Sequence, residues 1–265
     1  MQSLDIRFLK GLHFTAEHIS TLKKIGECKG RQKLYTEQTP EVLKSLQQVA
    51  MIESSECSNR LEGITAPHAR VEALVKRSAN PMNRSEQEIA GYRDALNLIH
   101  ESAKHMPFTE NIILQLHATI YRYLPEQGGR WKRTDNEIVE RNPDGTVRRV
   151  RFTPVKALAT PDAIKTMVTQ YREALEVHRQ ESLVVAPLAI LDFLCIHPFS
   201  DGNGRSARLL TTLLLYHFDY QVGRYISLER IFEESSQTYY DTLEASSQGW
   251  HEGRHDVLPW LTYFW

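Results

Sequence analysis

The chain has 265 residues, 41% hydrophobic and 25% charged, which is enough for one large globular domain. Its formal net charge of −1 gives no reason to expect direct contact with nucleic acid. The three cysteines have no paired spacing, which argues against a disulfide framework and against a zinc site. No apolar run approaches the roughly 20 residues that span a bilayer, and the N-terminus lacks a signal-peptide core. We therefore expect a cytoplasmic protein without membrane contact.

The N-terminal part of the chain has the periodicity of amphipathic helices. Apolar residues at helical spacing predict a first helix that Gly26 and Gly30 would end. In the next stretch, Thr39-Pro40 places a capping residue before a proline at the first helical position. Apolar residues then recur at helical spacing to about Leu61, and Gly63 follows as a stop signal. These signals predict a long second helix.

Three shorter helical segments follow. The first reaches Val75, and the second has capping-box spacing between Ser85 and Glu88. Thr109 begins the third, and His117 lies among its apolar residues. A histidine that stands alone on such a face is more often a core residue than a catalytic one. We interpret His117 as structural, with a catalytic role as the alternative.

A change of pattern after residue 126 predicts a β-hairpin. Residues 137–140 and 147–152 have strand-like composition, and Asn142-Pro143-Asp144-Gly145 between them is a turn sequence. A lone hairpin is only marginally stable, so it must lean on the helical body. Its second strand, VRRVRF, is basic. That strand is either a solvated edge protected by charge or a binding edge, and the sequence leaves both interpretations open.

Helical patterns return after the hairpin. Thr160-Pro161 again places a capping residue before a proline, and Pro187 is predicted to start the helix before the central polar loop. The last helical signals cover 226–232 and 235–247. The final residues, VLPWLTYFW, are so apolar that they either dock on the core or mark where a longer chain was cut. Together these segments predict a compact all-α fold with a single β-hairpin.

The central polar loop, His197 to Arg205, lies between two apolar runs that we predict as buried helices. Gly202 and Gly204 would let backbone N–H groups approach a ligand closely. A helix that starts near Asn203 would direct its N–H groups and the positive end of its dipole at the same place. The sequence therefore predicts an anion-binding loop.

Side chains in and after this loop add to the same chemistry. His197 is its only imidazole, and histidine is the usual general base for a hydroxyl group. Asp201 offers the hard oxygen that Mg²⁺ prefers, since this ion is commonly held by one or two carboxylates and substrate phosphates. Arg205 and Arg208 lie three residues apart and can neutralise further phosphate charge. These residue types together predict phosphate chemistry.

The segment HPFSDGNGRSAR, His197 to Arg208, resembles the Fic family. It matches the family signature H-P-F-x-x-G-N-G-R-x-x-R in full, with Asp201 at the preferred acidic position. Gly129-Arg130-Trp131, before the hairpin, is also typical of this family. The resemblance implies a compact Fic-type helical core with a β-hairpin flap over the site. It also implies transfer of AMP from ATP to a protein hydroxyl, with pyrophosphate leaving.

The resemblance assigns a role to each residue of the signature. His197 would deprotonate a target Ser, Thr or Tyr, and Asp201 would hold Mg²⁺. The remaining signature residues would bind the phosphates of ATP: Gly202, Gly204, Asn203 at the α-phosphate, Arg205 on the β-phosphate side and Arg208 at the γ-phosphate.

A second match lies upstream, where Ser58 to Gly63 fits the family's inhibitory motif [S/T]-x-x-x-E-[G/N]. In this interpretation Glu62 pairs with Arg208 and occupies the arginine meant for the γ-phosphate, because the arginine–carboxylate pair is a strong charge-assisted contact. Ser58, one helical turn earlier, would help fix the glutamate rotamer. The alternative is a solvated glutamate at a helix end. In some relatives the same glutamate positions a water that removes AMP, so a reverse activity stays open.

The motifs divide the chain into two predicted regions. Residues 1–80 form an N-terminal helical region with the inhibitory helix at about 40–63, and 81–265 form the Fic core with its flap at about 136–152. In the flap, Ile138 and Val139 would pair with the backbone of the target by strand addition. Tyr239 and Tyr240 are candidates to line the adenine pocket.

The leading hypothesis is an autoinhibited protein adenylyltransferase, with ATP as substrate, Mg²⁺ as cofactor and a protein hydroxyl as acceptor. One alternative is a nucleotide-sensing regulatory or toxin–antitoxin-type binding module. Another is the transfer of a different nucleotide, such as UMP. The expected partners are ATP and a target protein, and the sequence leaves open whether the chain forms a homodimer.

Overall fold

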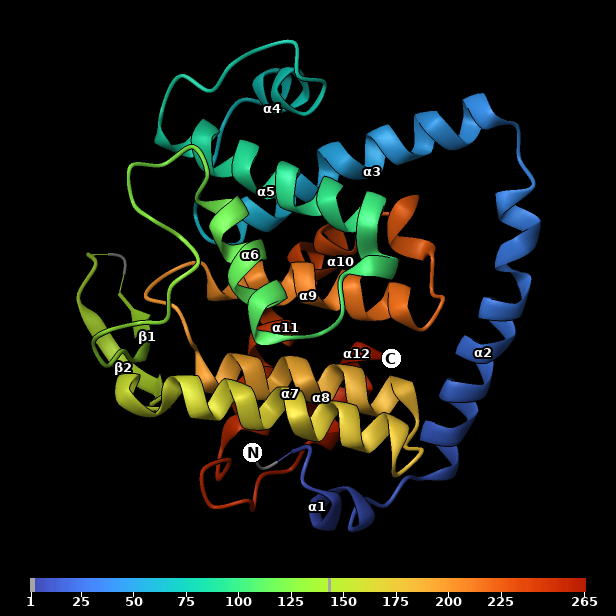
Figure 1. The fold of residues 1–265 in the computed structure, drawn as a ribbon, viewed down its shortest axis with the longest axis vertical. Helices are drawn as coiled ribbons and strands as arrows, with labels where there is room; N and C mark the ends of the chain where they lie inside the picture. Colours follow the sequence, from blue (N-terminus) through green and yellow to red (C-terminus); the bar gives the residue numbers. More distant parts are fainter. Residues whose placement is uncertain (1–2, 143) are drawn as a thin grey trace. The chain divides into compact units, whose positions relative to one another are not determined.

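A computed structural model describes residues 3–142 and 144–265, and in this part of the chain the predicted all-α fold with one hairpin is confirmed (Figure 1). In chain order the elements are α1 (Ile6–Lys10), α2 (Ala16–Thr36), α3 (Pro40–Arg60), α4 (His68–Val75), α5 (Arg84–Ser102), η1 (Ala103–His105), α6 (Glu110–Ile120), β1 (Ile138–Arg141), β2 (Val147–Phe152), η2 (Ala157–Ala159), α7 (Thr160–Glu176), α8 (Ser182–Ile196), α9 (Asn203–His217), η3 (Val222–Arg224), α10 (Leu228–Glu234), α11 (Ser236–Ser247) and α12 (Leu258–Phe264).

The chain forms two compact units, and each is assembled from segments far apart in the sequence. The first unit contains the described residues up to 22, together with 131–203 and 237–265. The second unit contains residues 23–130 and 204–236. The boundary between Asn203 and Gly204 falls within the predicted phosphate-binding loop, so each unit carries a different part of it. The division at about residue 80 that the motifs suggest stays a prediction.

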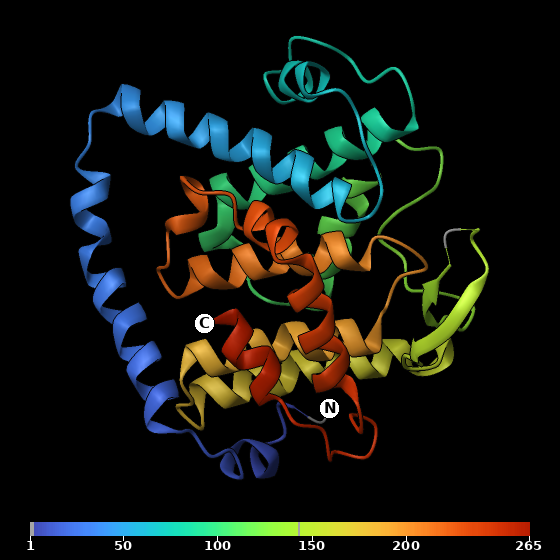
Figure 2. The ribbon, with the colours of Figure 1, turned by 180° about the vertical axis from the view of Figure 1, so that it is seen from behind.

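The first unit is built around α8, a helix that is apolar on all sides and almost entirely buried. Helix α7 lies beside it (Figure 1), and α12 packs against it on another side (Figure 2). Because such a helix gains its stability from neighbours that cover every face, this packing holds the residues at its end in a fixed frame. His197, the first residue of the polar loop, directly follows the last residue of α8.

The prediction that Pro187 starts this helix is wrong, because α8 begins at Ser182 and carries the proline in its interior. A proline inside a helix cannot donate to the carbonyl four residues earlier, here that of Leu183. The Trp265 indole donates to that carbonyl at 2.8 Å, and the Trp260 indole donates to the Pro187 carbonyl at 2.7 Å. The apolar C-terminal residues therefore dock on the core, which was one of the two interpretations of their composition.

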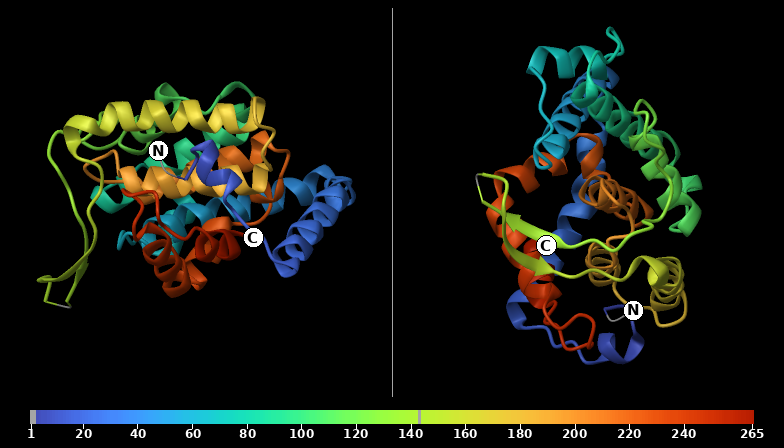
Figure 3. Two further views of the ribbon diagram at one scale, coloured as in Figure 1. Left: turned by 90° about the horizontal axis from the view of Figure 1, so that it is seen from below. Right: turned by 90° about the vertical axis from the view of Figure 1, so that its left-hand side faces the viewer.

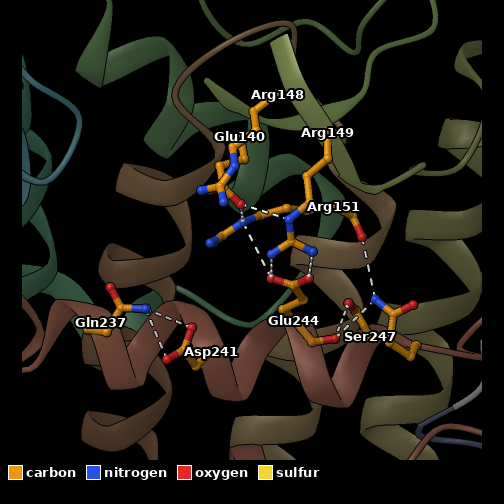
Figure 4. A network of polar contacts seen from close by, with 9 residues as sticks. Glu140, Arg148, Arg149, Arg151, Gln237, Asp241, Glu244 and Ser247 are labelled. Atoms are coloured by element: carbon orange, nitrogen blue, oxygen red, sulfur yellow. Dashed lines mark hydrogen bonds and ion pairs between the residues drawn. The ribbon is translucent and has the colours of Figure 1, made fainter. Parts of the chain in front are cut away.

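The predicted hairpin is confirmed as the antiparallel pair β1 and β2, which Figure 3 shows as two neighbouring arrows. Figure 4 shows how it leans on α11: Arg149 binds both carboxylate oxygens of Glu244, and Arg151 lies 3.4 Å from the same carboxylate. Glu140 of β1 pairs with Arg148 and Arg149. The basic strand is thus largely neutralised within the unit. Exposed pairs of this kind contribute at most about 1 kcal/mol each, so they orient the hairpin more than they stabilise it.

In the second unit, α3 packs against α4, α5 and α10, and α5 also contacts α6. Ile52, Val71, Leu74 and Ile89, from α3, α4 and α5, form a buried apolar cluster. Such clusters stabilise by about 25 cal/mol for each Å² of apolar surface removed from water. Among the described residues, no helix is both long and apolar enough to cross a membrane.

Three local predictions can be compared with the helices observed. The long helix predicted after Thr39 is confirmed as α3, whereas α2 does not end at Gly26 or Gly30 but continues to Thr36. Neither glycine would meet a neighbour within 4 Å if it carried a side chain, so neither marks a turn or a close approach. The prediction of a capping box between Ser85 and Glu88 is also wrong. Helix α5 is instead capped by Asn83, whose side chain accepts from the Glu86 N–H at 3.0 Å.

His117 has the structural role that we favoured. It is 5% exposed, and its Nδ1 accepts a hydrogen bond from the backbone N–H of Gly129 at 2.8 Å. This bond ties the segment that leads towards the hairpin to helix α6. Because Nδ1 accepts this hydrogen bond, the neutral His117 ring carries its proton on Nε2.

One buried charge in the first unit predicts a pH-dependent stability. Asp192, on α8, is 0% exposed, and its Oδ1 accepts from the Trp250 indole at 2.6 Å. Burial raises the pKa of this carboxyl from 3.8 to about 6, and hydrogen bonds with Ser3 and Trp250 only partly oppose the rise. A folded-state pKa above the unfolded value means that the group's contribution to stability is complete below pH 3.8. That contribution is lost as the pH rises through about 6.

We expect Asp192→Asn to remove this dependence. One pKa unit corresponds to about 1.4 kcal/mol, so the free energy of unfolding of the variant relative to wild type should rise by on the order of 3 kcal/mol between pH 4 and pH 8. Urea denaturation at several pH values measures this difference in the free energy of unfolding. The exposed Asp162→Asn variant is the control. Parallel pH profiles for Asp192→Asn and wild type would contradict the assignment.

Candidate functional site

His197 has an unusual backbone conformation at the end of α8. Its φ of 50° and ψ of 61° lie in the left-handed region, which non-glycine residues seldom adopt. Its N–H donates to the Phe193 carbonyl at 2.9 Å, and its Nδ1 lies 3.2 Å from the Leu194 carbonyl oxygen. Because a carbonyl only accepts, Nδ1 carries the proton of the neutral ring and Nε2 carries the lone pair. The basic nitrogen of the imidazole is thus Nε2, and the role of His197 as a base stays a prediction.

The Asn203 side chain bridges the polar loop by two hydrogen bonds to the backbone of Phe199. Its side-chain oxygen accepts from the Phe199 N–H at 2.9 Å, and its amide nitrogen donates to the Phe199 carbonyl at 2.8 Å. The Phe199 ring is fully buried and stacks on Trp131 at 5.3 Å between ring centroids. Phe199 therefore anchors the loop, and Asn203 shapes it. The contact of Asn203 with an α-phosphate stays a prediction.

Asp201 is the exposed carboxylate of the loop. Its Oδ1 accepts from the N–H of Gly202 at 2.7 Å, and Gly202 has a φ of 77°, which a residue with a side chain would rarely adopt. Within the described part of the chain, no three His, Cys, Asp or Glu side chains are grouped to hold a metal ion. A single carboxylate would hold Mg²⁺ only together with substrate phosphates, so the role of Asp201 as a Mg²⁺ ligand stays a prediction.

Two side chains that the sequence analysis did not single out bind the same loop. The Lys132 ammonium donates to the Ile196 carbonyl at 3.1 Å and to the Asn136 side-chain oxygen at 2.7 Å. The Asn136 amide donates to the Phe199 carbonyl at 3.2 Å. Burial lowers the pKa of Lys132 to about 8, and Asp135 opposes this change. The signal in the sequence was the position of Lys132 directly after the Gly-Arg-Trp stretch.

In the second unit, Arg208 of α9 lies among acceptors from the end of α3. The side chain is 2% exposed. Its Nε donates to the Ser58 hydroxyl at 2.8 Å, and its Nη2 donates to the Ser58 carbonyl at 2.8 Å and to Glu62 Oε1 at 2.7 Å. The structure therefore brings Glu62 and Arg208 together as the motif suggested. Their inhibitory role stays a prediction.

Ser58 contacts the same arginine as Glu62, and its expected effect on the glutamate rotamer stays a prediction. Its hydroxyl and its carbonyl both accept hydrogen bonds from the Arg208 guanidinium. Glu62 lies beyond the end of α3 at Arg60, in a turn, and its side chain is 31% exposed. Ser58 thus holds the arginine, while the glutamate reaches it from a turn that solvent can access.

Arg205 has a partner that the sequence did not indicate. Its guanidinium is 1% exposed, binds Glu88 of α5 at 2.6 Å and lies over the Tyr121 ring at 5.8 Å. A buried charge requires such a partner, since an unpaired one is strongly destabilising. Glu88 was expected to form a capping box and instead forms this ion pair. The contact of Arg205 with a β-phosphate stays a prediction.

Gly204 lies directly against the Glu62–Arg208 pair. A Cβ atom at this position would lie 2.2 Å from Glu62 Oε1 and 3.2 Å from Arg208 Nη1. The first distance is far below any real contact, so the carboxylate can occupy its place only because residue 204 has no side chain. Gly204 thus makes room for Glu62, and its approach to phosphates stays a prediction.

The other predicted site residues lie in the first unit. Tyr239 is 3% exposed and packs among the rings of Tyr240, Trp260 and Tyr263, with centroid distances of 5.1 to 5.8 Å. It is therefore a core residue, and Tyr240 is the more exposed of the two. In the hairpin, Ile138 and Val139 are half-buried on β1, opposite Phe152 and Val150. Their roles towards adenine and a target backbone stay predictions.

Comparison with known proteins identifies the class to which this site belongs. Residues 107–215 match the model of the Fic/DOC family, and this stretch holds the hairpin and the whole signature from His197 to Arg208. Residues 107–215 therefore form a Fic/DOC family domain. It is 24% identical over 232 residues to Protein adenylyltransferase Fic of Culex quinquefasciatus, with 83% of this chain covered.

Solved structures agree on the fold. A Fic family protein from Desulfovibrio desulfuricans aligns with a TM-score of 0.74 and 22% identity, covering 96% of this chain and 72% of that one. A Fic domain containing signaling protein from Bacteroides thetaiotaomicron aligns with a TM-score of 0.73 and 24% identity, covering 90% of both chains. The chain spans only about two fifths of the curated relatives it matches, 41% and 38% for two of them.

The Arg208 site predicts the effect of removing one hydroxyl. We expect Ser58→Ala to lower the free energy of unfolding by about 1–3 kcal/mol, because it removes the acceptor of a buried charged N–H group. Urea denaturation measures it. Ser55→Ala is a matched control on the same helix: Ser55 is also 0% exposed, and its hydroxyl has no hydrogen-bond partner among the described residues. Equal losses for the two variants would contradict the assignment.

Proposed function

We propose that this chain is a protein adenylyltransferase that transfers AMP from ATP to a Ser, Thr or Tyr hydroxyl of a protein. The observation that carries the proposal is the arrangement of His197 within the complete Fic signature, with its basic nitrogen at Nε2. The polar loop that follows leads directly into α9, a helix of 15 residues that begins at Asn203. The curated relatives named Protein adenylyltransferase Fic support the same activity.

The proposed reaction needs a base and a binding site for phosphate. His197 Nε2 accepts the proton of the target hydroxyl, and the oxygen forms a bond to the α-phosphorus of ATP. The bond from that phosphorus to the oxygen bridging to the β-phosphate breaks, and pyrophosphate leaves with the electron pair. The first N–H groups of α9 and the positive end of its dipole stabilise the charge on the phosphates. A Mg²⁺ ion bound by Asp201 would neutralise further phosphate charge.

We further propose that Glu62 inhibits this reaction in the resting protein. Arg208 is the residue assigned to the γ-phosphate, and its guanidinium is held by Glu62 and Ser58. ATP must displace the carboxylate before its γ-phosphate meets that arginine. To shift a site from 99:1 closed to 99:1 open, a ligand must bind the open state more tightly than the closed state by about 5.5 kcal/mol. One charge-assisted hydrogen bond contributes only about 1.5–3 kcal/mol. Inhibition by Glu62 alone is therefore partial.

These assignments predict the outcome of two substitutions. We expect Glu62→Gly to increase the labelling of the protein or of a target by ATP and Mg²⁺, because Arg208 becomes accessible to the γ-phosphate. His197→Ala, added to Glu62→Gly, should abolish labelling, since no base remains for the hydroxyl. Mass spectrometry measures both as a mass gain equal to one AMP group.

Matched variants separate this effect from a general change in the protein. Glu62→Gln keeps a hydrogen-bonding group without the charge and should give intermediate labelling. Glu252→Gly changes another exposed glutamate in a turn and should leave labelling at the wild-type level. No gain from Glu62→Gly would refute the inhibitory assignment. ATP binding without any transfer would favour a nucleotide-sensing module, and preferential labelling from UTP would favour UMP transfer.

A further inference from the structure

The segment directly before the hairpin binds consecutive backbone carbonyls, from the last residue of α8 into the polar loop. The Lys132 N–H donates to the Pro198 carbonyl at 2.8 Å, and its ammonium donates to the Ile196 carbonyl at 3.1 Å. The Asn136 amide lies 3.5 Å from the carbonyl oxygen of His197 and 3.2 Å from that of Phe199. Lys132 and Asn136 thus hold the carbonyl of His197, the proposed base, and the carbonyls of the residues before and after it.

The two side chains act as a pair. Lys132 Nζ also donates to Asn136 Oδ1 at 2.7 Å, so the lysine fixes which end of the amide faces the loop. Lys132 is 3% exposed, and its ammonium lies at the last residue of the 15-residue helix α8. A cation at this end of a helix is favoured by the helix dipole, which offsets part of the cost of burial.

The backbone of His197 gives this pair a role. The left-handed conformation costs a residue with a side chain on the order of 1 kcal/mol or more, which contacts with its surroundings can offset. This conformation determines the direction of the Cβ atom and therefore whether Nδ1 meets the Leu194 carbonyl, 3.2 Å away. Loss of that contact would remove the preference for the tautomer with its lone pair on Nε2.

We propose that Lys132 and Asn136 are positioning residues that hold His197 in its left-handed conformation and thereby set the tautomer and direction of its imidazole. The inference rests on the proposed function for its catalytic consequence. Its structural part concerns one ring and its hydrogen bond, so it can be tested without nucleotide.

The test uses Lys132→Met and Asn136→Ala in the full chain. Nitrogen-15 NMR of the histidine rings reports the tautomer, and the His197 signals are identified by their loss in His197→Gln. We expect wild-type His197 to show a protonated Nδ1, and both variants to move towards the tautomer mixture of free imidazole. Lys156→Met, which changes an exposed lysine of the same unit, should leave the His197 signals unchanged.

A kinetic measurement in the Glu62→Gly background adds a second readout. We expect both variants to lower kcat for AMP transfer roughly 10- to 100-fold, the scale of a base misplaced by about 1 Å, with KM for ATP unchanged. A simple loss of stability would lower the amount of folded protein without altering the ring signals of the folded fraction.

The outcomes separate this inference from the proposed function. Unchanged His197 signals in both variants, or a rise in KM with unchanged kcat, would overturn the positioning role. If no protein, including Glu62→Gly, transfers AMP, the proposed function fails, and the ring signals alone decide the inference. If Lys132→Met does not fold, the half-buried Asn136→Ala decides it.

Discussion

Two buried arginines on α9 impose the constraint on which the second unit depends. A guanidinium removed from water must find acceptors within the protein, because an unpaired buried charge is strongly destabilising. Arg205 meets this need with Glu88 of α5, and Arg208 meets it with Ser58 and Glu62 at the end of α3. Three helices distant in the chain are thereby joined by charge as well as by apolar packing. The same requirement explains why the glutamate motif lies where it does.

This pairing also connects stability with the proposed control of activity. Arg205 and Arg208 already have protein partners, so a nucleotide bound as proposed would exchange one acceptor for another. An exchange has a smaller net free energy than a new contact. Ser58 is buried and Glu62 is partly exposed, so the two acceptors differ in how readily they can leave. The geometry thus fits an arginine that stays in place while its carboxylate partner is replaced.

The first unit provides the rigid frame for the proposed base. Helix α8 is buried, and its interior proline is tolerated because the Trp265 indole binds the carbonyl that Pro187 cannot reach. At the other end of α8, Lys132 holds the backbone where His197 turns left-handed. The Phe199 ring fixes the next part of the loop in the core. Rigid support of this kind is what a base needs, since proton transfer depends on hydrogen-bond distance.

The sequence by itself determined the all-α class, the hairpin and the loop that begins at His197, because each depends on residues close together in the chain. It also pointed to Glu62, through a short motif at a helix end. Only the tertiary structure decided that Glu88 binds Arg205, 117 positions away, and that Ser58 binds Arg208 alongside Glu62. The physical reason is that a side chain's spacing in sequence shows which helix face it occupies, whereas its partner depends on which helices the core brings together.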